Sequence, residues 1–240
     1  FPWAGKAWTV PAERNSHALH GLVLNQPWDV VARTARVVEL VTTLADGWPW
    51  RGRVWQRYEI TPTGLRMKLE VRSEREAFPA GCGWHPWFRR DVADAASVRV
   101  SVPAASRYVL DGQIPTGVSV TPSGASDLAR GPELGERRLD DCYTALSGPV
   151  EIDWGRLRLR ISIECAVPHV MVYTQPEAFC IEPQSCAPDA FNLDARGIQG
   201  TGAAFAMPGR PVSIASRWEW SVGESGYVIV SPATPASASG

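Results

Sequence analysis

Apolar and charged residues alternate with a period of two in two segments of the chain. Residues 65, 67, 69 and 71 are apolar, and the positions between them are Arg66, Lys68, Glu70 and Arg72. The same alternation runs from 157 to 163, directly after Gly155. Because successive side chains of a strand point to opposite faces of a sheet, both segments are predicted to be antiparallel strands with one buried face.

Shorter apolar segments recur along the rest of the chain and are separated by glycine and proline. The further strands are predicted at 37–44, 54–60, 97–102, 169–174, 178–181, 217–222 and 227–230. No helical pattern of the usual length alternates with them, so a parallel βαβ architecture is not expected. The pattern predicts an all-β protein, a large antiparallel β-sandwich, with a single domain over 1–230.

Three segments have the composition of loops or tails. Segments 111–135 and 183–211 are rich in glycine and proline, and both are predicted to be loops that carry functional residues. Residues 231–240 are small and include prolines, which predicts a disordered tail.

Composition narrows the classes of function. The 240 residues include 24 Lys+Arg and 25 Asp+Glu, which gives a formal net charge of -1, so no nucleic-acid partner is indicated. No apolar run reaches the length of about 20 residues that a membrane span requires, so no membrane partner is expected. The five cysteines form no C-x-x-C pair, which favours reduced thiols and a cytoplasmic location.

Two residues have surroundings that suit acid–base chemistry. His85 lies between Trp84 and Trp87 and is followed by Pro86, which suits a proton donor beside a flat apolar ligand such as a sugar ring. Glu182 ends an apolar segment, and Pro183 after it is expected to end strand pairing. If Glu182 is buried there, its pKa rises toward the range of a general base. Taken singly, a core histidine and a solvent-facing glutamate are the more common interpretations of these two residues.

Other chemistries find little support. His17 and His20 could supply two ligands of a metal site, but no third ligand is marked by local spacing, so no metal is expected. The sequence contains no G-x-S-x-G nucleophile motif and no glycine-rich phosphate motif.

Four motifs in one order carry a resemblance to a known family. They are Asn15-Ser16-His17-Ala18-Leu19-His20-Gly21-Leu22, Gly83-Trp84-His85-Pro86-Trp87-Phe88, Leu139-Asp140-Asp141-Cys142-Tyr143 and Ile181-Glu182-Pro183-Gln184. Together they resemble the motifs of the aldose 1-epimerase (galactose mutarotase) family, over residues 8–230. The resemblance implies a galactose mutarotase-like supersandwich with a sugar bound in a cleft on one sheet.

The resemblance also implies roles for individual residues. Glu182 corresponds to the base that takes the proton from the C1 hydroxyl of an aldose, and His85 to the acid that protonates the ring oxygen. His20 and Asp140 correspond to residues that hold the sugar, although Asp141 leaves open which of the two acids faces the cleft. The family needs no cofactor, and its substrate is a small sugar.

Further sugar contacts are expected near the motifs. Trp84, Trp87 and Trp28 could cover the apolar face of the sugar, with core packing as the alternative, and Gln175 and Gln184 could bond its hydroxyls. Family members carry an N-R motif upstream of the histidine segment. Because only nineteen residues precede His20, the sequence is expected to be N-terminally incomplete.

Two other functions remain open at this point. A hexose-6-phosphate 1-epimerase would need cations for the phosphate, for which the candidates are Arg51, Arg53, Arg57, Arg89 and Arg90. A non-catalytic carbohydrate-binding module would keep the aromatic residues but would not need both His85 and Glu182. The preferred aldose and the oligomeric state are not indicated by the sequence.

Overall fold

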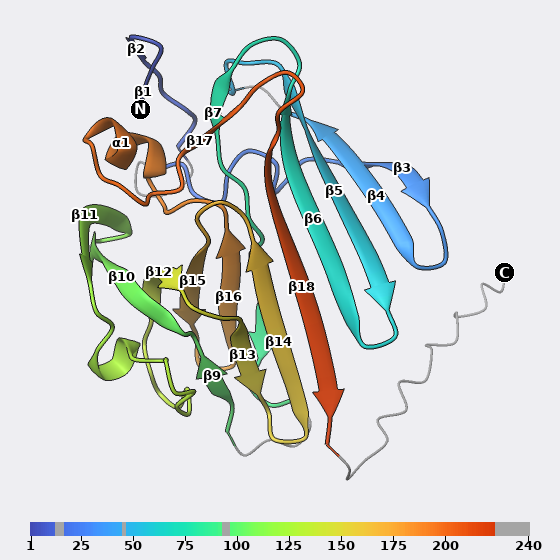
Figure 1. The fold of residues 1–240 in the computed structure, drawn as a ribbon, viewed down its shortest axis with the longest axis vertical. Coiled ribbons are helices and arrows are strands. Elements are labelled where there is room, and N and C mark those ends of the chain that lie inside the picture. The colour runs from blue at the N-terminus through green and yellow to red at the C-terminus, as the bar shows by residue number, and fades with distance from the viewer. Residues whose placement is uncertain (13–16, 45–46, 93–96, 224–240) are drawn as a thin grey trace, which may run out of the picture.

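Two antiparallel sheets form a sandwich in the computed structural model, which describes residues 1–12, 17–44, 47–92 and 97–223 (Figure 1). The larger sheet has eight strands, in the spatial order β3 (Asp29–Arg33), β4 (Val37–Thr43), β5 (Gly52–Thr61), β6 (Gly64–Ser73), β18 (Val212–Val222), β14 (Leu157–Glu164), β13 (Val150–Asp153) and β9 (Arg99–Ser101). The smaller sheet has six strands, in the order β11 (Ile114–Val120), β10 (Ala104–Asp111), β12 (Asp140–Leu146), β15 (His169–Thr174), β16 (Ala178–Gln184) and β8 (Trp87–Arg89). The fold class predicted from the sequence is confirmed.

Short elements lie at one end of the sandwich. They are the pair β1 (Pro2–Trp3) and β2 (Lys6–Ala7), the pair β17 (Ala204–Ala206) and β7 (Phe78–Ala80), and the helix α1 (Ala190–Ala195). Figure 1 shows α1 and the β1–β2 hairpin together beyond the end of the smaller sheet. Among the described residues, no helix has the length and apolar character of a membrane span.

The core between the two sheets explains the alternation in the sequence. Leu159 and Ile161 of β14 are buried in it, whereas Arg158 and Arg160 between them are exposed. The smaller sheet contributes Phe179 and Ile181 to the same cluster. Each strand that meets this core therefore has one apolar face, and its other face is left for charged or functional side chains.

Some local predictions were wrong. The segment 111–135, predicted as a loop, contains the edge strand β11 and a 3₁₀ helix, Gly124–Ser126. The segment 183–211 contains α1 and β17. Pairing does not end at Pro183, which lies opposite Val170 inside the β15–β16 ladder. The predicted strand 227–230 and the predicted tail 231–240 lie outside the described residues.

Candidate active site

The candidate site lies on the face of the smaller sheet that points away from the core. Along β16, Phe179 and Ile181 face the core, so Cys180 and Glu182 face outward. In the register of the sheet, Glu182 lies opposite Met171 of β15, and Cys180 lies between Tyr173 of β15 and Trp87 of β8. This face therefore gathers polar and aromatic side chains from three neighbouring strands.

Glu182 and His85 form the centre of the site. The Nε2 atom of His85 lies 3.2 Å from Oε1 of Glu182, and the Glu182 side chain is only 9% exposed. The other carboxylate oxygen, Oε2, accepts a hydrogen bond of 3.3 Å from the Gln184 amide. Burial raises the pKa of Glu182 to about 7, and the nearby Asp140 carboxylate also raises it, while the bond from Gln184 opposes the shift. A carboxyl with this pKa can both accept and release a proton near neutral pH.

His85 is held on both sides of its ring. Its Nδ1 atom lies 3.5 Å from the thiol sulfur of Cys180, and the ring meets that of His20 edge to face at 5.3 Å. Partial burial and the charge of His20 lower the pKa of His85, and its own backbone carbonyl opposes the shift. A lowered pKa makes the protonated imidazole a better proton donor.

The backbone at His20 adopts the left-handed conformation. His20 has φ of 61°, and Gly21 after it has φ of 71°. This conformation is costly for a residue with a β-carbon, and such residues gather at functional sites. The turn brings His20 to His85 across a separation of 65 residues, as the motifs implied. Asn15 and Ser16 of the same motif lie outside the described residues.

Of the three tryptophans predicted to contact a sugar, Trp87 is the one that remains open beside His85 and Glu182. Its ring stacks on His85 at 5.8 Å with an interplanar angle of 27°, yet Trp87 is 52% exposed. Tyr173 contacts the Trp87 ring edge-on at 5.8 Å, and the Gln175 amide donates a hydrogen bond to the Tyr173 hydroxyl. An exposed ring of this kind can stack on the apolar face of a pyranose.

The other two predicted tryptophans lie elsewhere. Trp84 and Trp28 pack against the aromatic cluster that includes Trp50 and Phe78, on the larger sheet. The indole nitrogen of Trp84 is buried. Both residues therefore fit the core-packing alternative.

The two acids of the Asp140-Asp141 motif face opposite sides of β12. Asp141 lies on the core side, where its carboxylate accepts bonds from Arg107 at 3.1 Å and from Ser126 at 2.7 Å. Asp140 lies on the side of Glu182; it is exposed at the surface but partly surrounded by protein, and this partial desolvation raises its pKa, as does the Asp141 charge. Asp140 is therefore the acid available to a ligand beside Glu182.

Sequence reasoning missed Tyr173 and Cys180. The signal that could have found Cys180 is its spacing of two from Glu182, which places both on one face of a strand. His85, Cys180 and Glu182 each offer one donor atom, and the three atoms lie within 4.8 Å of one another. These three residues are the candidates for holding a cation.

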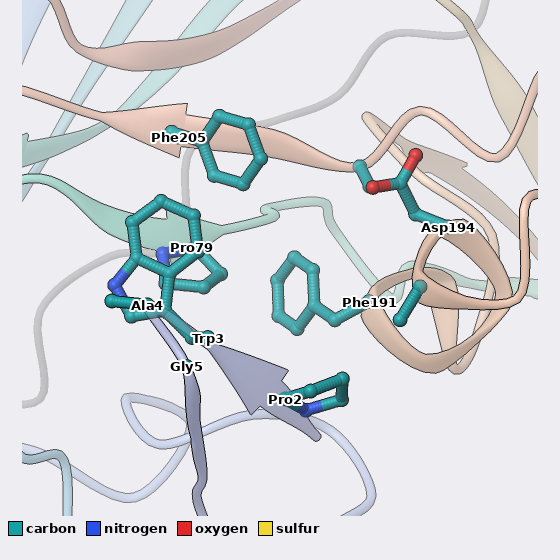
Figure 2. Close-up of a pocket in the computed structure, with 10 residues that line it drawn as sticks. Pro2, Trp3, Ala4, Gly5, Pro79, Phe191, Asp194 and Phe205 are labelled. Atoms are coloured by element: carbon teal, nitrogen blue, oxygen red, sulfur yellow. The ribbon is translucent and has the colours of Figure 1, made fainter.

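A separate pocket, which neither His85 nor Glu182 lines, lies between the β1–β2 hairpin, β7, β17 and α1 (Figure 2). Its volume is about 270 Å³. It is lined by the aromatic rings of Trp3, Phe191 and Phe205, and Asp194 lies at its edge. Asp194 is the one titratable side chain that lines it, so the pocket lacks a donor–acceptor pair. The chemistry therefore places the candidate site at Glu182.

Comparisons with known proteins agree with this fold. The chain is 23% identical over 205 residues to the uncharacterized protein YihR of Escherichia coli, which covers 80% of this chain and 67% of that protein. Among solved structures, it is similar to a galactose mutarotase-like protein from Clostridium acetobutylicum, with a TM-score of 0.82 and 17% identity over 93% of this chain and 75% of that one. It is also similar to the GalM/aldose epimerase homologue from C. elegans, with a TM-score of 0.77 and 18% identity over 92% of this chain and 77% of that one.

At these identities the structural likenesses establish the fold alone. The sequence model of the aldose 1-epimerase family, in contrast, matches residues 1–201, which is most of the chain. The chain therefore belongs to the aldose 1-epimerase family.

Proposed function

We propose that the protein interconverts the α and β anomers of a free hexose by acid–base ring opening and closure. The observation that carries the proposal is the contact of 3.2 Å between His85 Nε2 and Glu182 Oε1 beside an exposed aromatic ring. In an aldose, the anomeric hydroxyl and the ring oxygen are bonded to the same carbon. A base and an acid must therefore lie close together to act on both, as these two groups do.

The proposed reaction needs only proton transfers. Glu182 removes the proton of the C1 hydroxyl while His85 donates a proton to the ring oxygen, so the C1–O5 bond breaks and an open-chain aldehyde forms. The C1–C2 bond then rotates, and the ring oxygen attacks the other face of the aldehyde. His85 takes back its proton and Glu182 returns its own, so both residues end as they began. In this mechanism, His20 contacts the sugar near its ring oxygen, and Asp140 binds its hydroxyl groups.

The direct test is the rate at which freshly dissolved α-glucose and α-galactose approach anomeric equilibrium, followed by polarimetry or proton NMR. The protein is expected to accelerate both far above the buffer rate. Sugar binding without acceleration would contradict the proposal and favour a carbohydrate-binding module.

Glucose 6-phosphate serves as the third substrate in this test. Four of the five arginines considered for a phosphate are already engaged: Arg53 pairs with Glu74, Arg57 with Glu39 and Glu59, and Arg89 with Asp91. Arg90 donates to the carbonyl oxygens of Gln175 and Gly135. These bonds favour a free sugar, and acceleration confined to glucose 6-phosphate would reverse that choice.

Replacing Trp87 with alanine is expected to weaken sugar binding more than catalysis. Loss of the ring removes a stacking surface of the kind worth about 1.4 kcal/mol, so KM should rise about tenfold while kcat changes little. Steady-state kinetics on α-galactose measure both constants. Trp220→Ala, which removes a partly exposed tryptophan from β18 of the other sheet, should leave KM unchanged.

Asparagine substitutions should separate the two neighbouring acids. Asp140→Asn is expected to raise KM without lowering the melting temperature, since Asp140 is exposed on the side of Glu182. Asp141→Asn should instead lower the melting temperature, because it weakens the bonds to Arg107 and Ser126. Thermal unfolding and kinetics on both variants check this, and the opposite pattern would mean that Asp141 faces the ligand.

A further inference from the structure

The site holds a third chemically active group that the proposed acid–base cycle leaves unused. Cys180 is fully buried, and its sulfur lies on the outer face of β16 beside both members of the pair. The donor atoms of His85, Cys180 and Glu182 are an imidazole nitrogen, a thiol sulfur and a carboxylate oxygen. All three lie within 4.8 Å of one another.

Two contacts among these residues have lengths close to those between neighbouring ligand atoms of a tetrahedral cation. With Zn–S of about 2.3 Å and Zn–N and Zn–O of about 2.1 Å, neighbouring ligand atoms lie about 3.4 to 3.6 Å apart. The observed contacts are 3.5 Å from Cys180 Sγ to His85 Nδ1 and 3.2 Å from His85 Nε2 to Glu182 Oε1. An imidazole gives a cation one nitrogen, so the His85 ring must turn for that nitrogen to meet both partners.

The chemistry of the three donors selects the class of cation. Sulfur and imidazole nitrogen favour zinc and its neighbours, whereas magnesium and calcium take oxygen ligands. Three protein ligands leave a fourth position open. Of the three ligands, His85 is the nearest to solvent, with a side chain that is 31% exposed, while Cys180 and Glu182 are buried.

We propose that His85, Cys180 and Glu182 bind a borderline-soft divalent cation of the zinc class, which reversibly inhibits the protein by occupying its acid–base pair. On binding, the Cys180 thiol releases its proton to solvent, and the proton between His85 and Glu182 is displaced. The cation then bonds the two atoms that the sugar would otherwise meet. The inhibition rests on the proposed function, but the binding does not.

Cobalt(II) is the probe for binding, because a thiolate–cobalt bond gives a charge-transfer absorption that imidazole and carboxylate ligands do not. Protein kept reduced with a non-thiol reductant is titrated with Co²⁺, and the band is then displaced with Zn²⁺. The band is expected in the native protein and absent in Cys180→Ala. It should persist in Cys142→Ala, a matched control that removes an equally buried thiol from the same face of the sheet, on β12, which β15 separates from β16. Absence of the band from the native protein, or its persistence in Cys180→Ala, overturns the proposal.

Inhibition is measured on the rate of anomer exchange, with each variant compared with its own uninhibited rate. Zn²⁺ should abolish the anomer exchange catalysed by the native protein, and a chelator should restore it. In Cys180→Ala, loss of the sulfur ligand should raise the Zn²⁺ concentration needed for inhibition by at least about 100-fold. Equal inhibition of Cys180→Ala overturns the inhibitory role. A cobalt band in a protein without epimerase activity would refute the proposed function and leave the cation site standing.

Discussion

Glu182→Gln is expected to lower the rate of anomer exchange by about 10³-fold, because a glutamine amide cannot accept a proton at neutral pH. The substitution keeps the size and shape of the side chain, and it puts a neutral group where burial already disfavours the charged form of the carboxyl. Folding should therefore be intact, and the loss should appear in kcat. Polarimetry on α-galactose gives the rate, and circular dichroism gives the melting temperature.

The matched control for this variant is Glu151→Gln. Glu151 is exposed on β13 of the larger sheet, where it lies opposite Arg160 and Ser101. Its replacement makes the same chemical change far from the site and should leave the rate unchanged. If Glu182→Gln kept a rate within a few-fold of the native protein, Glu182 would not be the base.

The second large effect concerns acid stability and comes from His169. This histidine is completely buried, donates a hydrogen bond of 2.9 Å from Nδ1 to the Val167 carbonyl, and stacks on Tyr108. Burial lowers its pKa to about 4, although the carbonyls of Val167 and Gly200 oppose the shift. In the unfolded chain a histidine has a pKa of about 6.5, so between these values the unfolded state binds a proton that the folded state does not.

The free energy of unfolding should therefore fall as the pH drops from about 6.5 to about 4. The contribution of His169 to stability is complete above about pH 6.5, the pKa of the residue in the unfolded chain. It is lost as the pH falls toward about 4, the pKa of the residue in the folded protein. A shift of this size corresponds to about 3 kcal/mol. Urea unfolding at a series of pH values measures how the free energy of unfolding depends on pH. In His169→Gln, the decrease between about pH 6.5 and about pH 4 that comes from this histidine should be absent.

His17→Gln provides the comparison, since it makes the same chemical change at an exposed histidine. That variant should keep the native slope. Parallel curves for the native protein and His169→Gln would show that His169 does not couple folding to pH.

Much of the sandwich could be predicted because half-buried strands leave a clear pattern in the sequence. The alternation around Leu159 exists because one face of β14 meets a core and the other meets water. Around Leu69, one face of β6 meets a core and the other carries charged residues, among which Glu70 is buried between Lys68 and Arg72. The strand β11 was missed because it contains Pro115 and Gly117, which are typical of loops. Pro115 is tolerated there because β11 is an edge strand, with one side free of ladder bonds.

The motifs led to His85, Glu182 and His20, but the surroundings of these residues depend on the folded chain. Spacing along the sequence shows that Asp140 and Asp141 face opposite sides of a strand, yet only the sheet determines which side holds the core. The same holds for Trp84 and Trp87, which flank one histidine. One packs against residues of the larger sheet, and the other stays open beside β16. Tertiary contacts of this kind leave no local signal.

The position of β8 at the edge of the smaller sheet has a consequence for the evolution of the sequence. Three residue pairs join β8 to β16, whereas Glu182 belongs to a strand paired on both of its sides. Glu182, the proposed base, therefore lies in a strand that is paired on both sides, whereas Trp87 projects from an edge strand, on the face opposite to Phe88, the residue of β8 that packs into the core. Divergence in sugar preference among descendants of this sequence should therefore gather around Trp87, while the framework under the base stays the same.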